Sequence, residues 1–504
     1  MAYGCRKPKF LLKKSKLELL DIFKGANLDV NFSKRVLLRQ WPANFVAPTH
    51  KDEERNVCPL HSNFRRCLDG LRKVGAAFNL PRSVRAICAS TLCPNPDTVP
   101  LTPSTWPQCC ALGQCISCPK VIIELPPNTN AIAHFLQWKK GNTSKLDRNG
   151  NPKEVHSLFP VSVPLSEAVK MLEDFFPKIK VHVFVASHQY EALKIRTESL
   201  HLGDLLTVED YTMNIDILYS ETTTSSHYSA NVTSFAGYPI AVRYMSPLTL
   251  EPAKGAILFI SEDKKHDFEQ VEIFEKRAVE ICEEKCGQVI QHWNRWSDNC
   301  SGQFKSRKTM GKLIQACDNV LGGKDPEDCK VSWEFLEANE AKNESDTIGG
   351  FSKTALRQTI LRDPDIVIRT AEDLVQVIQK GLEKSCQGSE KYSFVHVEVI
   401  PPFERQEVDV ELPIKGIQSL HSFTLMDGGI LASQLSCHLC TVASLCESCK
   451  KVELTVSRQD VESAVECLTA TVDDEEVVDI EGEYEGDDSD TEDDAGSDSG
   501  EEDE

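Results

Sequence analysis

The sequence lacks any long apolar run. No stretch of its 504 residues approaches the ~18 consecutive apolar residues that a membrane-spanning helix needs. Its opening, MAYGCRKPKF, has none of the apolar core of a secretory leader. We therefore expect a nuclear or cytoplasmic protein that neither enters a membrane nor is secreted. A glycine-rich phosphate loop and a G-x-S-x-G turn are also missing, and the Cys and His residues follow no thiol-protease motif.

Positive charge is absent from the C-terminal end. Residues 473–504 hold 19 Asp or Glu and no Lys or Arg. Of the 77 acidic residues in the chain, the other 58 are nearly balanced by the 56 basic residues. The net charge of −21 thus belongs to the tail, which we expect to be disordered over residues 471–504. The charged residues before Glu18 are all basic. This asymmetry predicts DNA contact at the basic end and a basic protein partner for the acidic tail.

Cysteine is missing from residues 119–281 but plentiful on both sides. Without an export signal the 20 cysteines should be reduced, so clusters of them indicate metal ligands. The C-terminal cluster has the pattern Cys437-x2-Cys440-x5-Cys446-x2-Cys449. Two CxxC pairs predict zinc, held either by all four thiolates or with the help of a partner such as His438.

A second zinc site is predicted in the N-terminal cysteine-rich block. Cys58-x2-His61 and Cys115-x2-Cys118 have the form of two half-sites. The spacing does not single out four ligands from the candidates, which are Cys58, His61, Cys88, Cys93, Cys109, Cys110, Cys115 and Cys118. Such a module beside a basic segment suits DNA binding, and it equally suits a staple for a loop-rich region without its own core.

Composition and pattern divide the chain into five segments. These are a basic segment (1–54), a cysteine-rich region (55–177), a central core (178–362), an α/β segment with the CxxC pairs (363–470) and the acidic tail (471–504). Alternating and apolar runs predict strands at 180–187, 204–211, 227–245, 256–263, 288–296, 330–338, 392–399 and 408–412. Helices are expected near 63–78, 166–176, 267–286, 303–321 and 346–361, and after the capping box at Thr370.

The central order of strands and helices is that of the ribonuclease H fold, an α/β (α+β) mixed sheet with flanking helices. That fold places one carboxylate on the first strand, one after the fourth and one on a later helix, and Asp210, Asp298 and Asp346 occupy these places. Two Mg²⁺ or Mn²⁺ ions held by such acids stabilise both oxygens of an in-line displacement at phosphorus. Glu344 and Asp263 are alternates. Any one of these acids taken alone also reads as an ordinary loop residue.

Basic residues lie on both sides of the predicted acidic centre. Lys264 and Lys265 precede one helix, and Lys305, Arg307 and Lys308 follow Asp298. They are candidates for binding nucleic-acid phosphates, contacts that position a duplex without reading its sequence. The alternative is a solvated helix face.

Three blocks resemble a transposase-derived family of largely uncharacterised animal proteins. They are SEDKKHD (261–267), HWNRWSDNCSGQFKSR (292–307) and WEFLEANEAKNESDTIGG (333–350). The family has an acidic strand end like VEDY, a W-S-D-G-C-x-x-Q-[FY]-K block and an H-G-K-x-x-x-D-G-I-G-G block, and the similarity covers most of residues 55–450. The resemblance implies a ribonuclease-H-like DDE/DDD domain in which Asp210, Asp298 and Asp346 match the acidic positions.

The sequence departs from the family pattern at two places. Asn299 replaces the commonest glycine, and Glu340 and Ala341 replace a His-Gly pair. Retained acids favour a DNA-binding protein that cleaves or transfers DNA strands with Mg²⁺. The lost histidine favours the alternative, a domesticated, catalytically inactive scaffold that binds DNA or protein.

Overall fold

The computed structural model describes most of the chain between residues 58 and 457. The described residues are 10–11, 45–46, 58–75, 83–93, 102–119, 131–146, 152–219, 233–300, 303–314, 316, 321, 329–338, 343–363, 365–387, 392–405, 412, 414–426 and 429–457. The predicted tail, most of the basic segment, the Glu340-Ala341 pair and the strand expected at 408–412 (Leu412 excepted) lie outside them. No described helix is long and apolar enough to cross a bilayer.

The chain divides into two units. The smaller consists of residues 1–63 and 138–157, and the larger consists of residues 64–137 and 158–504. In the smaller unit β1 (Phe10–Leu11) runs parallel to β2 (Phe45–Val46). The Asn63 side chain there donates to the carbonyl of Trp138 at 2.9 Å and accepts from its amide at 2.7 Å. The paired strands β3 (Ile132–Leu146) and β4 (Pro152–Pro164) run from one unit into the other.

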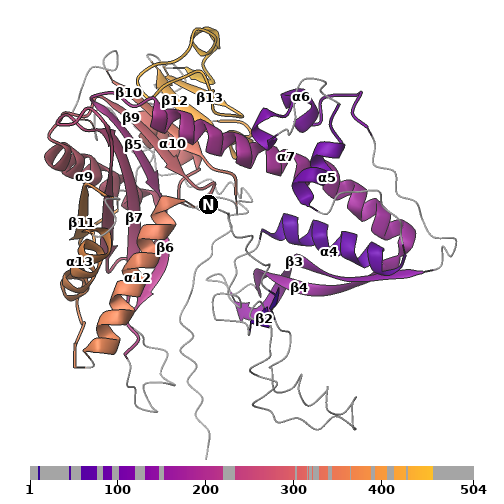
Figure 1. Ribbon diagram of the computed structural model, residues 1–504, viewed down its shortest axis with the longest axis horizontal. Helices are drawn as coiled ribbons and strands as arrows, with labels where there is room; N and C mark the ends of the chain where they lie inside the picture. The colour runs from indigo at the N-terminus through magenta and orange to yellow at the C-terminus, as the bar shows by residue number, and fades with distance from the viewer. Residues whose placement is uncertain are drawn as a thin grey trace, which may run out of the picture. The chain divides into compact units, whose positions relative to one another are not determined.

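A ten-stranded mixed sheet forms the centre of the larger unit, as the predicted α/β class requires (Figure 1). Its order is β11-β8-β7-β5-β9-β10-β12-β13-β14, with β6 paired to β7. The strands are β5 (Asp204–Glu209), β6 (Thr212–Asp216), β7 (Ser234–Met245), β8 (Pro252–Ser261), β9 (His292–Ser297), β10 (Lys330–Phe335), β11 (Phe394–Val399), β12 (Ser422–Met426), β13 (Gly429–Ser433) and β14 (Val456–Ser457).

Strand direction changes across this sheet. Neighbours among β5, β7 and β8 are antiparallel, whereas β9 is parallel to β5 and β10 is parallel to β9. The edge strand β11 is parallel to β8, and β12, β13 and β14 add an antiparallel run beyond β10. Strands from residues 394–457 therefore belong to the same sheet as the central segment.

Helices cover both faces of the sheet. On one face α9 (Phe268–Cys286) and α10 (Arg307–Ile314) pack against side chains such as Leu205 and Tyr238. On the other face lie α7 (Leu165–Glu198), α12 (Glu344–Arg362) and α13 (Ala371–Gln387). The other helices of the described residues are α4 (Pro59–Lys73), α5 (Val84–Ser90), α6 (Gln108–Ala111) and short 3-10 turns at Pro103–Thr105, Ile417–Ser419 and Cys449–Lys451.

Local sequence signals account for several of these boundaries. Asp267 caps α9 by accepting from the amide of Gln270 at 3.1 Å, and Gly287 ends the helix with a φ of 67°. The predicted capping box before α13 is confirmed, since Thr370 and Asp373 each accept from the other's amide. In α12, Gly349 lets the helix approach β6, because a Cβ there would lie 3.1 Å from the Thr212 hydroxyl.

The strand predicted at residues 180–187 is wrong. These residues belong to α7, which continues through Pro177 and ends only at Glu198. The run KVHVFVAS alternates like a strand, but Ile179, Val183, Phe184 and Val185 are all buried. A helix covered on several sides does not show the 3.6-residue period on which the distinction from a strand depends.

Candidate metal centres

Two of the predicted acidic ligands follow neighbouring parallel strands. Val208 of β5 pairs with Trp296 of β9, and Asp210 and Asp298 come two residues further along. Side chains alternate along a strand, so both aspartates continue the side of Val208 and Trp296. Those two residues pack with Ile348 of α12. The sheet thus brings Asp210 and Asp298 to one edge, on the face that α12 covers.

Asp346 lies in the first turn of α12. Its carboxylate accepts the amide of Asn343 at 3.0 Å, and the Asn343 side chain accepts from the amide of Asp346 in return. Asp346 is exposed, whereas Asp210 and Asp298 are half-buried. The three are not among the described groups whose ligand atoms all lie within 4.8 Å of one another.

The three carboxylates share one electrostatic environment. Burial raises the pKa of Asp210 well above its usual range, and the charges of Asp298 and Asp346 raise it further. Burial also raises the pKa of Asp298 to about 6, with a further contribution from Asp346. The amide of Cys300, which donates to Asp298 at 3.0 Å, opposes that rise. Burial and mutual repulsion therefore disfavour ionisation of Asp210 and Asp298 in the absence of a cation.

The alternate ligands are engaged elsewhere. Glu344 accepts from Arg243 at 2.9 Å and from Lys254 at 2.8 Å, which ties α12 to β7 and β8. Asp263 pairs with Arg405 at 2.7 Å. These acids have positively charged partners of their own, so they are weaker candidates than the three aspartates.

The predicted phosphate-binding residues fall into two groups. Lys264, Lys265 and Arg307 are exposed, and Lys308 is half-buried. Lys305 has no exposed surface, and its ammonium donates to the carbonyl of Gln418 at 3.0 Å. Burial lowers its pKa to about 7. Lys305 lies inside the fold, which corrects its prediction as a phosphate contact.

The four C-terminal cysteines converge as the spacing predicts. The sulfurs of Cys437, Cys440, Cys446 and Cys449 all lie within 4.8 Å of one another, and those of Cys437 and Cys446 are 3.7 Å apart. Four thiolates complete a tetrahedral zinc shell, so this cluster could bind zinc without His438. The His438 ring instead stacks on His188 with centroids 3.9 Å apart.

Amide hydrogen bonds support thiolates in this cluster. The amide of Leu439 points at the Cys437 sulfur at 3.4 Å, and the amide of Cys446 points at the Cys440 sulfur at 3.3 Å. Hydrogen bonds from the main chain of Cys449 and Ser448 help to lower the pKa of the Cys446 thiol to about 7.

The second cluster unites Cys93, Cys110, Cys115 and Cys118, whose sulfurs again lie within 4.8 Å of one another. The Cys93 sulfur is 3.5 Å from that of Cys115 and 4.0 Å from that of Cys118. A hydrogen bond from the main chain of Ser117 helps to lower the pKa of Cys115 to about 7. This cluster could also bind zinc.

The expected pairing of Cys58-x2-His61 with Cys115-x2-Cys118 is wrong, since Cys93 and Cys110 complete the latter set. Cys58 and His61 belong to the smaller unit. Cys88 is buried in α5, and burial raises its pKa to about 12.

Sequence reasoning missed two buried polar groups near these sites. Glu337, just after β10, contacts His182 at 2.7 Å and His421 at 2.9 Å. Arg295 of β9 contacts the carboxylates of Glu209 (3.2 Å) and Glu275. The only local signal for Arg295 was a charged residue between the two tryptophans of β9, and the Glu337 group joins three distant segments.

Residues 189–436, just under half of the chain, match the family model described as a domain of unknown function (DUF8701). The matched range begins within α7 and ends directly before Cys437, so it contains all three aspartates and neither four-cysteine cluster. No curated protein and no solved structure matches the chain.

Proposed function

We propose that this protein is a transposase-derived, DNA-binding nuclease or strand-transfer enzyme that uses divalent metal ions. The observation that carries the proposal is that Asp210 and Asp298 follow the paired strands β5 and β9, while the charges of Asp298 and of Asp346 in α12 add to the burial that raises the pKa of Asp210. The strand order β8-β7-β5-β9-β10 further supports a ribonuclease-H-like core, because three antiparallel strands are followed there by two parallel ones.

The residues present fit such ions. Carboxylate oxygens are the ligands that Mg²⁺ and Mn²⁺ prefer, and the mutual repulsion of these three acids is relieved by a cation. The three aspartates do not gather within a single coordination sphere, so a pair of ions would suit them better than one ion.

Each aspartate has a distinct part in this proposal. When bound, the ions supply a Lewis acid at the scissile phosphate and favour ionisation of the attacking hydroxyl. Asp210 and Asp298, which follow adjacent strands, would hold the ions at the sheet edge. The turn that directs the amide of Cys300 to Asp298 orients that carboxylate. Asp346 would offer the ions its other carboxylate oxygen, since one oxygen accepts the amide of Asn343.

The proposal is tested with purified full-length protein on supercoiled plasmid DNA. We expect nicking in Mn²⁺ or Mg²⁺ that stops with a chelator and falls at least about 100-fold in Asp298→Asn, since a metal ligand is lost. Glu262→Gln is the matched control, because Glu262 is exposed in the neighbouring loop. An absence of metal-dependent nicking in the wild type, or full activity in Asp298→Asn, contradicts the enzymatic proposal.

The competing proposal is a scaffold that binds DNA without cleaving it. It is favoured by the capping role of Asp346. This role explains an acidic residue at that position without any metal ion. A gel-shift titration separates the two. Binding that depends on salt but not on Mg²⁺, unchanged in Asp210→Asn and accompanied by no cleavage, supports the scaffold.

A further inference from the structure

We propose that both four-cysteine clusters are structural Zn²⁺ sites and that helix α7 is fastened by both, one ion acting through short elements that pack on the helix and the other through the C-terminal part of the helix. This inference is independent of the proposed nuclease. It concerns what the ions would do for the fold, and it rests on contacts within the larger unit.

The sulfur separations fit zinc rather than a disulfide. A tetrahedral ion with Zn–S bonds of about 2.3 Å separates its sulfurs by roughly 3.8 Å. The separations between Cys437 and Cys446 (3.7 Å) and between Cys93 and Cys115 (3.5 Å) are close to that value. A disulfide needs about 2.05 Å. Four thiolates leave no open position for a substrate, so each ion would be structural.

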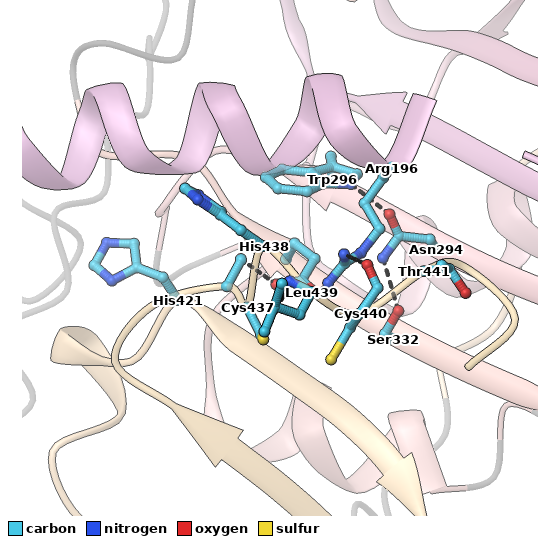
Figure 2. Close-up of polar contacts among 12 residues, drawn as sticks. Arg196, Asn294, Trp296, Ser332, His421, Cys437, His438, Leu439, Cys440 and Thr441 are labelled. Atoms are coloured by element: carbon cyan, nitrogen blue, oxygen red, sulfur yellow. Dashed lines mark hydrogen bonds and ion pairs between the residues drawn. The ribbon is translucent and has the colours of Figure 1, made fainter. Parts of the chain in front are cut away.

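Positively charged side chains lie near the C-terminal cluster, as a buried zinc–thiolate site requires. Four thiolates and one Zn²⁺ carry a net charge of about −2, which is costly to bury unless cations lie nearby. Arg196 of α7 is 3 % exposed, and its guanidinium donates to the carbonyl of Cys440, as Figure 2 shows. The ammonium of Lys330 donates to the next carbonyl, that of Thr441, at 2.7 Å.

Glu334 lies in the same buried region and also contacts Arg196. Its carboxylate lies 3.9 Å from Arg196 and accepts the hydroxyl of Ser436. Arg196 therefore stands between the Glu334 carboxylate and the main chain that carries the cysteines. Its charge compensates both.

Two turns of α7, one at His188 and Gln189 and one at Arg196, attach to the segment just before and within the first CxxC pair. His188 contacts the carbonyl of Ser436 at 2.9 Å and stacks on His438. The Gln189 amide donates to the Ser436 hydroxyl at 2.8 Å, and its carbonyl accepts the Ser436 amide at 3.0 Å. Further along the helix, the Arg196 guanidinium donates to the carbonyl of Cys440. An ion that fixes Cys437 and Cys440 thereby fixes the C-terminal part of α7.

The other cluster is carried by elements that pack on the same helix. Cys93 follows α5 and Cys110 lies in α6, and both of these helices contact α7, as does the 3-10 turn between them (Figure 1). Helices of seven and four residues are too short to be stable alone, so a metal staple accounts for their order.

The first test counts metal in the full-length protein by mass spectrometry after gel filtration. We expect two zinc ions per chain, and one in each of Cys446→Ser and Cys118→Ser. Cys109→Ser is the matched control and should keep two, because Cys109 is exposed next to Cys110 but lies outside the cluster. A wild-type content below two, or two ions retained in Cys446→Ser, overturns the assignment.

The second test asks whether the ions hold α7 and avoids variants that fail to fold. Wild-type protein is stripped with a chelator and compared with the zinc-loaded form by hydrogen exchange. We expect exchange in α7 to rise at least tenfold without zinc and to recover when zinc alone is added back. Unchanged exchange in α7 overturns the fastening.

A third measurement isolates the charge effect. Arg196→Gln should weaken zinc binding at the C-terminal cluster at least tenfold in a competition with a chromophoric chelator. Gln189→Leu, which removes uncharged contacts to the same segment, should change the zinc affinity less than threefold. Equal losses in the two variants contradict the compensating role of Arg196.

Discussion

The Glu344 carboxylate forms an ion pair with Arg243 at 2.9 Å, and this contact ties the first turn of α12 to β7. Lys254 on β8 approaches the other oxygen at 2.8 Å. Asp346 is two residues further along the same turn. The pairing thus fixes the third proposed metal ligand relative to the sheet.

Replacing Glu344 with Gln should displace Asp346 without removing it. If the proposed activity holds, we expect plasmid nicking to fall about tenfold, equivalent to roughly 1.4 kcal/mol in the barrier. Raising the Mn²⁺ concentration should recover part of the loss, since the defect is in ligand placement. Glu372→Gln, at an exposed acid in the first turn of α13, is the control. Full activity in Glu344→Gln at low Mn²⁺ would show that the pairing does not position the site.

Gly381 should resist substitution because α12 and α13 touch there. A Cβ at Gly381 would lie 2.3 Å from the Cβ of Ala355. We expect Gly381→Ala to destabilise the protein by about 1–3 kcal/mol, although alanine favours helices by about 1 kcal/mol over glycine. Gly350→Ala, with nothing within 4 Å of its Cβ, should stabilise it instead. Urea unfolding measures both, and effects of the same sign would be inconsistent with this packing.

Glu337 should make stability depend on pH in the acid range. Burial alone would raise its pKa, but hydrogen bonds with His182 and His421 outweigh burial and lower the pKa to about 2, from 4.5. The unfolded chain therefore takes up a proton first as the pH falls. The stabilisation, up to about 3 kcal/mol, should be complete above pH 5 and disappear as the pH falls from 4.5 towards 2.

The Glu337→Gln variant tests this dependence. It should be less stable than the wild type at pH 7, and the difference should shrink by pH 3. Glu262→Gln, at an exposed acid, should follow the wild type at both values. A gap that stays constant from pH 7 to pH 3 would argue against the lowered pKa.

The exposed pair Lys264 and Lys265 should contribute to DNA affinity through phosphates alone. We expect the double alanine variant to weaken binding of every duplex to a similar degree and to reduce the slope of log affinity against log salt by about 2. Lys276→Ala is the control, since Lys276 is also an exposed lysine but lies on helix α9, which follows the lysine pair in the sequence. An unchanged salt slope in the double variant would remove these lysines from the interface.

Much of the central sheet could be predicted because its strands carry strong local patterns. The runs at 204–211, 256–263 and 330–338 became β5, β8 and β10 within a few residues. The strands β12 and β13 were not predicted, although the Asp427-Gly428 pair between them in the sequence is a hairpin signal. They are short, and their place beside β10 is set by pairing between distant segments.

Sites made by one segment were easier to predict than sites made by several. The C-terminal cysteines lie within thirteen residues, so spacing alone identified the set. In the N-terminal block Cys93 joins Cys115 across 22 residues of chain, and nothing in the spacing selects it over Cys88. Arg196 and Glu334, which lie beside the C-terminal cluster, come from distant elements that only the tertiary fold brings together.

The most direct test of the proposed metal centre is a crystal of the full-length protein soaked in Mn²⁺ and measured at the manganese absorption edge. We predict anomalous density bonded to carboxylate oxygens of Asp210 and Asp298 at about 2.2 Å, with Asp346 reaching the same ion or a second one. Crystals of the Asp298→Asn variant, soaked in the same way, should lack that density. A wild-type map with no anomalous density between Asp210 and Asp298 at millimolar Mn²⁺ would contradict the account.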